Sequence, residues 1–363
     1  MRILFDLEHP AHVHFFKNVI WNLDKERHDT KIIAKNKEIT TNLLDTLRFK
    51  YTLVSKYYPS MYKKIFGVID KDLKLFGIVK KFKPDVMVGI LTPHIAHVGK
   101  IMGKVSINFT DTEDVKFGNL LTIPFTNVVC TPSCFLKDLG KKHVRYNGYH
   151  ELAYLHSNYF KPDTSVLDDL NLSKNDKFTI LRFISWSASH DIGLRGIRDA
   201  RNLIKSLEPY GKIFITSERK LSPELEKYRI TCSPEKIHSL LYYSQLYIGE
   251  GGTMATESAI LGTPAIHIES NSSGIATGNF SGNFLELRDK YDLLYFYPDQ
   301  EQALEKAIEI LEDKNSKKEW QRKREKLLRD KIDVTAWMTD FIERYPESFY
   351  EYRESSKKQY LYK

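Results

Sequence analysis

A glycine-rich turn followed by a helical stretch carries the clearest chemistry in this sequence. Residues 249–264 read GEGGTMATESAILGTP, and the apolar run 246–248 before them predicts a buried strand. Gly251 and Gly252 allow a tight turn, and Thr253 can cap or open the helix that follows. The unpaired N–H groups at such a helix start favour an anion, most naturally a phosphate.

A single acid extends this phosphate site toward a nucleotide. Glu257 lies four residues after Thr253, so a helix turns both side chains to the same face. A carboxylate one turn in from a phosphate can accept hydrogen bonds from a ribose diol. The pattern therefore predicts a nucleotide-diphosphate pocket. The alternative is a solvated Glu257 in one of the many strand–turn–helix units of α/β proteins.

Three histidines follow the first predicted strand. Residues 6–15 read DLEHPAHVHF, and the loop falls at the carboxyl end of the strand. His12, ahead of His9, is the candidate general base that removes a proton from an acceptor hydroxyl. His9 and His14 could instead cap or pack against the helix. No further ligand set for a metal is evident.

Acids and hydroxyls follow two further predicted strands. Asp111 and Glu113, in the run TDTED after the strand 105–109, could serve as an acid/base pair or as helix-capping acids. The loop 182–193, RFISWSASHDIG, follows the predicted strand 178–183 and offers Ser187 and His190 as phosphate contacts. Packing or capping is the alternative role for His190.

The length, the net charge and the distribution of apolar residues indicate which partners and which cellular compartment to expect. The chain has 363 residues and a formal charge of +8, which favours anionic partners such as nucleotide sugars or lipid head groups. The lysine- and arginine-rich stretch from about 314 to 331 lacks aromatic interleaving and is interpreted as a solvated helix face, with no nucleic-acid partner. No apolar run approaches the ~18 residues of a membrane span. The start of the chain lacks a signal-peptide core, so we expect a cytoplasmic protein.

Short apolar runs alternate with helical stretches through the whole chain. This alternation predicts an α/β fold of two doubly wound Rossmann-like domains facing a cleft. The expected boundaries are 1–160 for the first domain, 161–330 for the second domain and 331–363 for a final helix and a tail.

Residues 57–82 combine many apolar side chains with six lysines. Such an amphipathic surface could lie on an anionic membrane or admit a lipid-linked acceptor. The more ordinary interpretation is a helix pair that covers the sheet with its lysines facing water.

These motifs carry a family resemblance. The segment 249–264 resembles the donor-nucleotide loop of GT-B glycosyltransferases and of UDP-N-acetylglucosamine 2-epimerases, in which a glutamate five residues before the closing glycine holds the ribose. Together with HPAHVH, GYHELAYLH and SASHDIG, it resembles an uncharacterised archaeal and bacterial family of GT-B-like proteins, from residue 1 to about 340. The resemblance implies a GT-B-like fold with residues 1–160 as the N-terminal acceptor-side domain and 161–330 as the nucleotide-sugar domain. It also implies that a helix within 331–363 crosses back to the first domain ahead of a tail, but it does not supply a reaction.

The resemblance also suggests roles for single residues. His12 resembles the histidine at the mouth of the first helix in many GT-B transferases, although the glycine-rich approach to that histidine is absent here. The corresponding loop of the epimerases carries a catalytic acid, which favours Asp111 or Glu113. The loop of His190 meets the donor phosphates in the GT-B fold.

Three functions remain open from the sequence. The first is a metal-independent glycosyltransferase that uses a nucleotide sugar, most naturally a UDP-sugar and with no other cofactor, in surface polysaccharide or glycolipid synthesis. Its acceptor would be a glycan or a lipid-linked molecule at the inner membrane face. The second is a 2-epimerase-like epimerase or hydrolase acting through Asp111, Glu113 and His190. The third is a non-catalytic protein that binds nucleotide or lipid.

Overall fold

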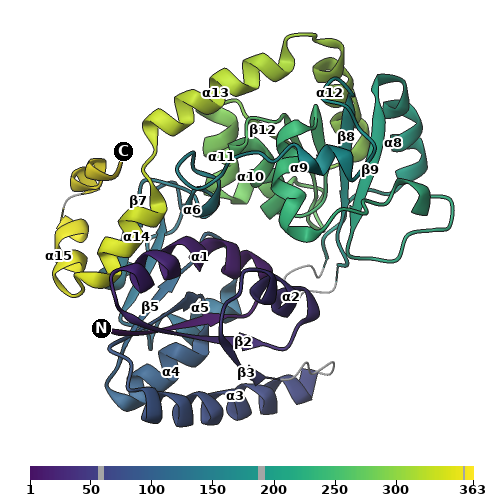
Figure 1. Cartoon of the computed structure of the whole chain (residues 1–363). Helices are drawn as coiled ribbons and strands as arrows, with labels where there is room; N and C mark the ends of the chain where they lie inside the picture. Colours follow the sequence, from purple (N-terminus) through teal and green to yellow (C-terminus); the bar gives the residue numbers. More distant parts are fainter. Residues whose placement is uncertain (56–60, 187–192, 355) are drawn as a thin grey trace. The chain divides into compact units, whose positions relative to one another are not determined.

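Two compact units make up the computed structural model, which describes residues 1–55, 61–186, 193–354 and 356–363. Unit 1 comprises Met1–Tyr159 and Ile332–Lys363, and unit 2 comprises Phe160–Lys331 (Figure 1). Each unit contains one parallel β-sheet, so each is described by itself.

The sheet of unit 1 has seven parallel strands in the order β3-β2-β1-β4-β5-β6-β7. The strands are β1 (Arg2–Leu7), β2 (Asp29–Lys35), β3 (Tyr51–Ser55), β4 (Val86–Ile90), β5 (Val105–Phe109), β6 (Val128–Pro132) and β7 (His143–Tyr146). The helices are α1 (Pro10–Lys25), α2 (Glu38–Thr46), α3 (Met61–Phe82), α4 (Pro93–Met102), α5 (Lys116–Thr122), α6 (Leu152–Leu155), α14 (Val334–Glu343) and α15 (Glu347–Glu354). An α-helix lies between each pair of successive strands from β1 to β6, because parallel strands need crossover connections, and a short 3-10 helix, Gly140–Lys142, lies between β6 and β7.

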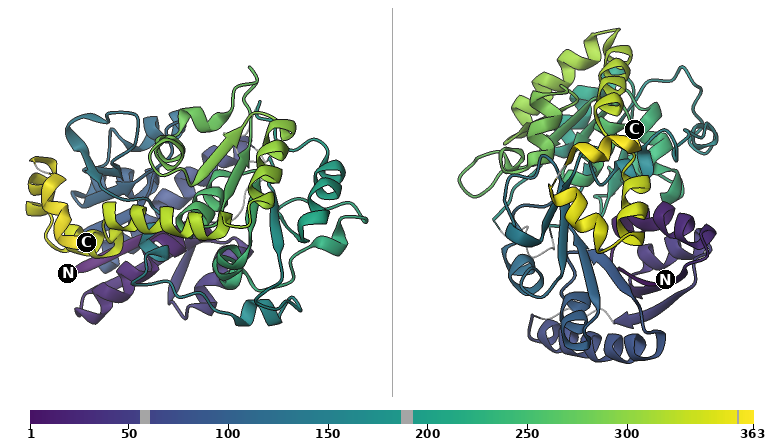
Figure 2. Two further views of the ribbon diagram at one scale, coloured as in Figure 1. Left: turned by 90° about the horizontal axis from the view of Figure 1, so that it is seen from above. Right: turned by 90° about the vertical axis from the view of Figure 1, so that its left-hand side faces the viewer.

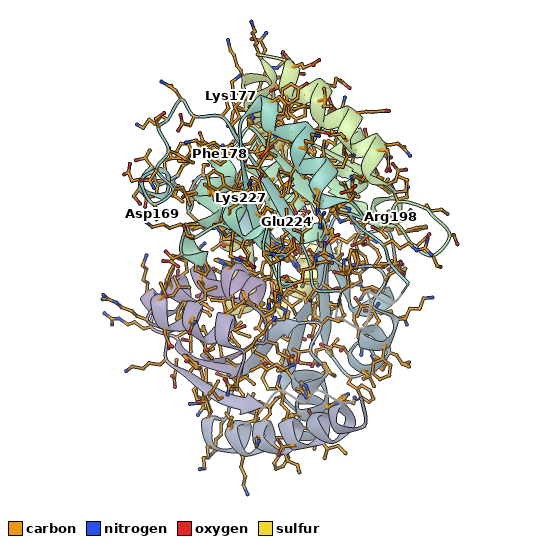
Figure 3. All side chains as sticks on the ribbon, turned by 90° about the vertical axis from the view of Figure 1, so that its right-hand side faces the viewer. Asp169, Lys177, Phe178, Arg198, Glu224 and Lys227 are labelled. Atoms are coloured by element: carbon orange, nitrogen blue, oxygen red, sulfur yellow. The ribbon has the colours of Figure 1, made fainter. Side chains whose placement is uncertain are left out.

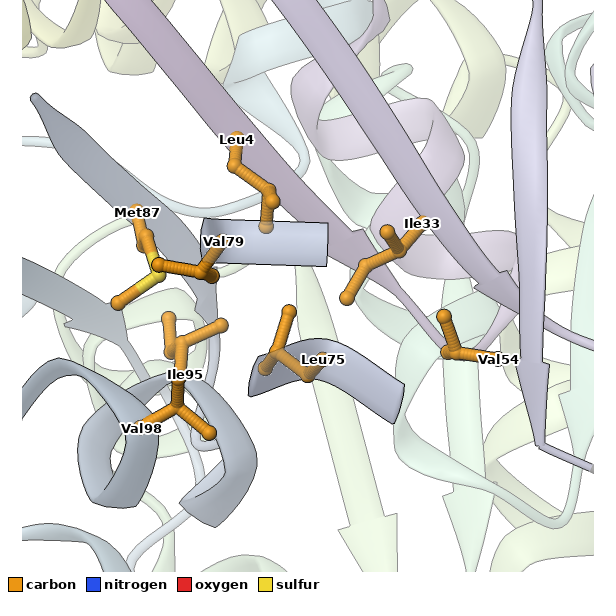
Figure 4. Packing of buried hydrophobic residues seen from close by; sticks show 8 residues of the cluster. All are labelled: Leu4, Ile33, Val54, Leu75, Val79, Met87, Ile95 and Val98. Carbon is orange, nitrogen blue, oxygen red and sulfur yellow. The ribbon is translucent and has the colours of Figure 1, made fainter. Parts of the chain in front are cut away.

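Buried apolar side chains join this sheet to α3 and α4. The cluster consists of Leu4, Ile33, Val54, Leu75, Val79, Met87, Ile95 and Val98 (Figure 4). Leu75 and Val79, four residues apart, lie on the inner face of α3. The expected helix pair is wrong for the described residues, since no proline interrupts 61–82 and one helix runs through them. The expectation that its lysines face water fails at Lys71, which is buried.

The last part of the chain packs within unit 1. Helix α14 lies beside α1 (Figure 2). The side chain of Asp333 caps α14, accepting a hydrogen bond from Ala336 N at 2.9 Å. Its other oxygen accepts from Asn158 and Tyr159 at 2.8 and 2.9 Å. These bonds fix the start of α14 against the end of the first segment of unit 1.

The sheet of unit 2 has five parallel strands in the order β12-β11-β10-β8-β9. The strands are β8 (Phe178–Phe183), β9 (Lys212–Ser217), β10 (Leu246–Gly249), β11 (Ala265–Ile268) and β12 (Leu294–Tyr297). The helices are α7 (Ser165–Asp168), α8 (Ala200–Leu207), α9 (Ile237–Tyr243), α10 (Gly252–Ile260), α11 (Gly282–Asp289), α12 (Gln300–Glu312) and α13 (Ser316–Asp330).

Side chains of α13 hold the carboxyl end of α10. Gln321 Nε2 donates to the carbonyls of Leu261 and Gly262 at 3.0 and 2.9 Å, and Arg324 Nε donates to Ile260 O at 2.9 Å. These bonds satisfy carbonyls that the helix end leaves open. The basic stretch is therefore not wholly a solvated face, because part of it positions α10.

None of the described helices combines the length and the apolar character needed to cross a bilayer.

Candidate functional site

The start of α10 is built for an anion. Gly251, at φ +81°, occupies the N-cap position without a side-chain cap, and the helix begins at Gly252. A Cβ on Gly251 would lie 2.9 Å from the Ile184 side chain, so this turn favours glycine in two ways. Gly252 and Thr253 are exposed. The first-turn N–H groups and the helix dipole therefore face an accessible surface.

Glu257 lies one turn further along α10 and is buried, with 5% of its surface exposed. Its Oε1 is 2.9 Å from Nε2 of His238, a buried residue of α9. The interpretation of Glu257 as a solvated helix residue is wrong, because the helix turns this position toward α9. The exposed Thr253 and the buried Glu257 thus differ in environment although they are four residues apart.

Glu250 anchors the neighbouring loop. It is fully buried, and its carboxylate accepts hydrogen bonds from Ile184 N at 2.9 Å and Ile197 N at 2.8 Å. Burial raises the pKa of Glu250, and the two backbone donors oppose that rise. Both ends of the loop after β8 are thereby tied to the turn after β10. Ser187 and His190 lie outside the described residues.

In unit 1, the histidines of the loop after β1 have different surroundings. His9 is exposed and caps α1, because its Nδ1 accepts a hydrogen bond from Ala11 N at 3.2 Å. His12 Nδ1 accepts from Glu8 N at 3.3 Å. Burial lowers the pKa of His12 to about 4; Glu8 opposes this shift, and His150 and Lys71 add to it. His12 is therefore neutral at physiological pH.

A buried lysine binds the acids of the same loop. Lys71 Nζ donates to Asp6 at 3.0 and 2.8 Å and also to Glu8. Thr92 Oγ1 donates to Asp6 Oδ2 at 2.7 Å. Burial alone would raise the pKa of Glu8, but Lys71 and then His94 lower it to about 2. Glu8 therefore stays ionised at physiological pH, and its low pKa makes it unsuited to act as a base.

Two histidines of α4 extend this network. His94 Nε2 lies 3.8 Å from Glu8 Oε1, and His94 Nδ1 lies 2.6 Å from Asp72 Oδ1. His97 Nδ1 lies 3.1 Å from the other oxygen of Asp72. Sequence reasoning missed Lys71, Asp72 and the α4 histidines, since they lie far along the chain from the loop after β1. The polar start of α4, directly after a buried strand, was the available signal.

The two acids after β5 occupy different surroundings. Glu113 is buried, and its Oε1 accepts a hydrogen bond from Leu136 N at 3.2 Å. Asp111 Oδ2 lies 3.4 Å from Nδ1 of His150, in the turn after β7. His150 also influences His12 electrostatically. The structure thus gathers His12 and Asp111 around His150, whereas His9 and Glu113 serve the local backbone.

Two hollows of unit 2 lie away from the start of α10. One, of ≈ 730 Å³, is lined by residues including Lys177, Tyr210 and Lys212, at the amino ends of β8 and β9. The other, of ≈ 520 Å³, is lined by residues including Arg198 and Glu224 (Figure 3). Ligands of parallel α/β sheets bind at the carboxyl ends of the strands, so neither hollow is the predicted nucleotide site.

One group of three side chains among the described residues could hold a cation: Glu26, His28 and Glu343. His28 Nε2 lies 2.7 Å from Glu343 Oε1. The group sits just before β2, at the opposite edge of the sheet from the loop after β1.

Comparison with solved structures shows the fold. The UDP-N-acetylglucosamine 2-epimerase from Neisseria meningitidis bound to UDP-GlcNAc superimposes with a TM-score of 0.64 at 12% identity, covering 97% of this chain and 100% of that one. The epimerase from Methanocaldococcus jannaschii gives 0.60 at 14% identity, over 86% and 94% of the chains. The calicheamicin glycosyltransferase CalG4 gives 0.58 at 11%, over 95% and 98%. The predicted α/β, GT-B-like fold is confirmed.

Sequence comparison gives the family. The uncharacterized protein MJ0665 of Methanocaldococcus jannaschii is 25% identical over 276 residues, 73% of this chain and 80% of that protein. Residues 1–338 match the family described as "Protein of unknown function (DUF354)". The predicted membership of an uncharacterised GT-B-like family is confirmed: the chain belongs to the DUF354 family.

Proposed function

We propose that this protein is a metal-independent glycosyltransferase that uses a nucleotide sugar, a UDP-sugar, in surface polysaccharide or glycolipid synthesis. One observation carries the proposal: an exposed, glycine-capped helix start with Glu257 one turn further along α10. The structural neighbours support a nucleotide-sugar function, since the Neisseria epimerase compared above is bound to UDP-GlcNAc.

The donor half of the chemistry falls to unit 2. The first-turn N–H groups after Gly251 bind the diphosphate and stabilise the negative charge that develops as it leaves. Ser187 and His190 contribute further donors to the same phosphates. The Glu257 carboxylate accepts hydrogen bonds from the ribose diol. Fixed backbone dipoles thereby supply the charge stabilisation, and no metal ion takes part in this mechanism.

A 2-epimerase-like reaction is the second candidate. Both UDP-N-acetylglucosamine 2-epimerases compared above share the fold, and Asp111 lies beside His150 in unit 1. The two reactions differ in their need for an acceptor. Incubation with UDP-N-acetylglucosamine alone should leave the sugar unchanged if the protein is a transferase. A new sugar in the product, detected by NMR, would instead favour an epimerase or hydrolase. A non-catalytic nucleotide- or lipid-binding protein would bind UDP and convert no UDP-sugar, even with acceptors supplied.

The proposed acceptor is a glycan or lipid-linked molecule at the inner face of the membrane. Unit 1 supports this placement with exposed apolar side chains on the packed helices α3, α4 and α5: Ile69, Leu73, Phe76, Ile101, Phe117 and Leu120. Exposed lysines accompany them, including Lys74, Lys80 and Lys100. Apolar groups fringed by positive charge suit an anionic lipid surface.

Vesicle flotation tests this surface. Leu73→Glu should reduce partition onto anionic vesicles about tenfold or more, because it places a charge where an apolar side chain, 69% exposed, would enter the lipid. Ile39→Glu is the matched control, since Ile39 is also exposed but lies on α2, which packs beside α1. Failure of the unaltered protein to bind anionic vesicles at low salt would refute the membrane placement.

A further inference from the structure

Two buried polar atoms near the end of β7 have no hydrogen-bond partner among the described residues: Tyr146 Oη and His150 Nε2. Both residues are more than nine-tenths buried. Folded proteins satisfy most buried polar atoms, so unpaired ones at the carboxyl end of a parallel sheet point to a role in binding or catalysis. Tyr146 and His150 lie together, their rings parallel within 7° at a centroid distance of 6.3 Å.

The surroundings of His150 fix its orientation. Its ring lies 4.2 Å from that of Phe15, and its Nδ1 faces Asp111 Oδ2 at 3.4 Å. A carboxylate beside Nδ1 favours the neutral tautomer that carries its proton there, which leaves the Nε2 lone pair available. This is the arrangement by which a carboxylate orients a histidine base. The Asp111 side chain is 25% exposed and forms the accessible edge of the cluster.

His12 has the opposite arrangement. Because its Nδ1 accepts the hydrogen bond from Glu8 N, the neutral ring carries its proton on Nε2. Its outer nitrogen is then a donor, suited to bind a ligand oxygen. Asp111 influences His150 electrostatically, and Glu8, His150, Lys71 and Lys37 influence His12.

We propose that His150 Nε2, and not His12, accepts the proton of the acceptor hydroxyl, with Asp111 as its positioning residue. This inference rests on the proposed transferase function. The acceptor O–H bond breaks and its proton moves to Nε2. The acceptor oxygen forms a bond to the anomeric carbon, and the bond from that carbon to the diphosphate breaks, with its electron pair leaving on UDP.

The tautomers can be read without any ligand. Long-range ¹H–¹⁵N spectra of ¹⁵N-histidine-labelled protein at pH 7, assigned with His150→Gln and His12→Gln, should show His150 protonated on Nδ1 and His12 on Nε2. The reverse pattern at His150 would overturn the proposal. Because this measurement needs no nucleotide, a failure of the protein to bind UDP would count against the proposed function and not against the tautomer assignment.

The second test measures turnover as UDP release from UDP-N-acetylglucosamine in the presence of supplied glycan or lipid-linked acceptors. His150→Gln should lower kcat about 10²–10⁴-fold, the usual contribution of a general base, with the Kd for UDP unchanged. Asp111→Asn should also lower kcat and change the acid limb of the pH–rate profile. His143→Gln is the matched control, since His143 is equally buried at the other end of β7. Full activity of a folded His150→Gln protein would overturn the proposal.

Discussion

Lys71→Met is expected to lower the free energy of unfolding by about 3–5 kcal/mol, because it leaves the carboxylates of Asp6 and Glu8 without their cation. Asp6 and Lys71 are almost fully buried, so solvent cannot replace the lost interaction. Methionine fills a similar volume, which confines the effect to charge. Urea unfolding at pH 7 measures the change.

The same helix offers a matched control. Lys74 pairs with Asp70 at 2.7 Å, but both side chains are more than 40% exposed, so Lys74→Met should cost at most ~0.5 kcal/mol. Equal losses from the two variants would contradict the account of the buried network.

The cost of Lys71→Met should also depend on pH. The network lowers the pKa of Glu8 to about 2 in the folded protein. A carboxyl group whose pKa is lower in the folded protein than in the unfolded chain stabilises the fold at any pH above its unfolded pKa. This stabilisation is lost as the pH falls through the pKa of the folded protein. The difference between the variant and the unaltered protein should therefore shrink as the pH falls from about 4.5 to 2. A difference independent of pH would show that packing, and not charge, carries the effect.

Glu257→Ala is expected to weaken UDP binding about 10- to 150-fold. The variant removes a charged acceptor from the ribose diol, and such hydrogen bonds contribute about 1.5–3 kcal/mol. Calorimetric titration with UDP measures the loss. Titration with inorganic pyrophosphate, which has no ribose, should show little difference between the variant and the unaltered protein.

Loss of the buried pair with His238 is a separate effect of the same substitution. His238→Gln breaks the 2.9 Å contact but keeps the carboxylate of Glu257. It should leave the Kd for UDP within about threefold while lowering thermal stability, as removal of one partner of a buried polar pair does. If His238→Gln weakens UDP binding as much as Glu257→Ala, the ribose assignment is wrong and Glu257 serves packing.

The sheets could largely be predicted because their central strands are short apolar runs. Residues 105–109 and 178–183 were predicted as strands and form β5 and β8 over the same residues. Strand β3 was missed, since two of its side chains, Thr52 and Leu53, are exposed and its pattern is weak. Strand β12 was missed as well, because alternation of buried and half-buried residues over four positions is too short a signal.

The glycine-rich turn could be predicted because its chemistry is local. Gly251 and the helix after it occupy consecutive positions, so sequence alone places them. The polar contacts of unit 1 are not local in the sequence. Lys71 contacts Asp6 across 65 positions, and His150 lies beside Asp111 across 39 positions. Only the strand order brings these residues to one edge of a sheet. Burial then decides their protonation, and the sequence does not show burial directly.

The most direct test of the central claim is a thermal-shift screen of the unaltered protein with UDP, GDP, CMP, dTDP and ADP, without added metal. A ligand that binds the folded state alone raises its stability, so we predict a clear increase in Tm with UDP. The increase should be absent with uridine, which lacks the diphosphate that the start of α10 is proposed to bind. No shift with any of the five nucleotides would contradict a nucleotide-sugar function and leave the turn at Gly251 as a structural element of the fold.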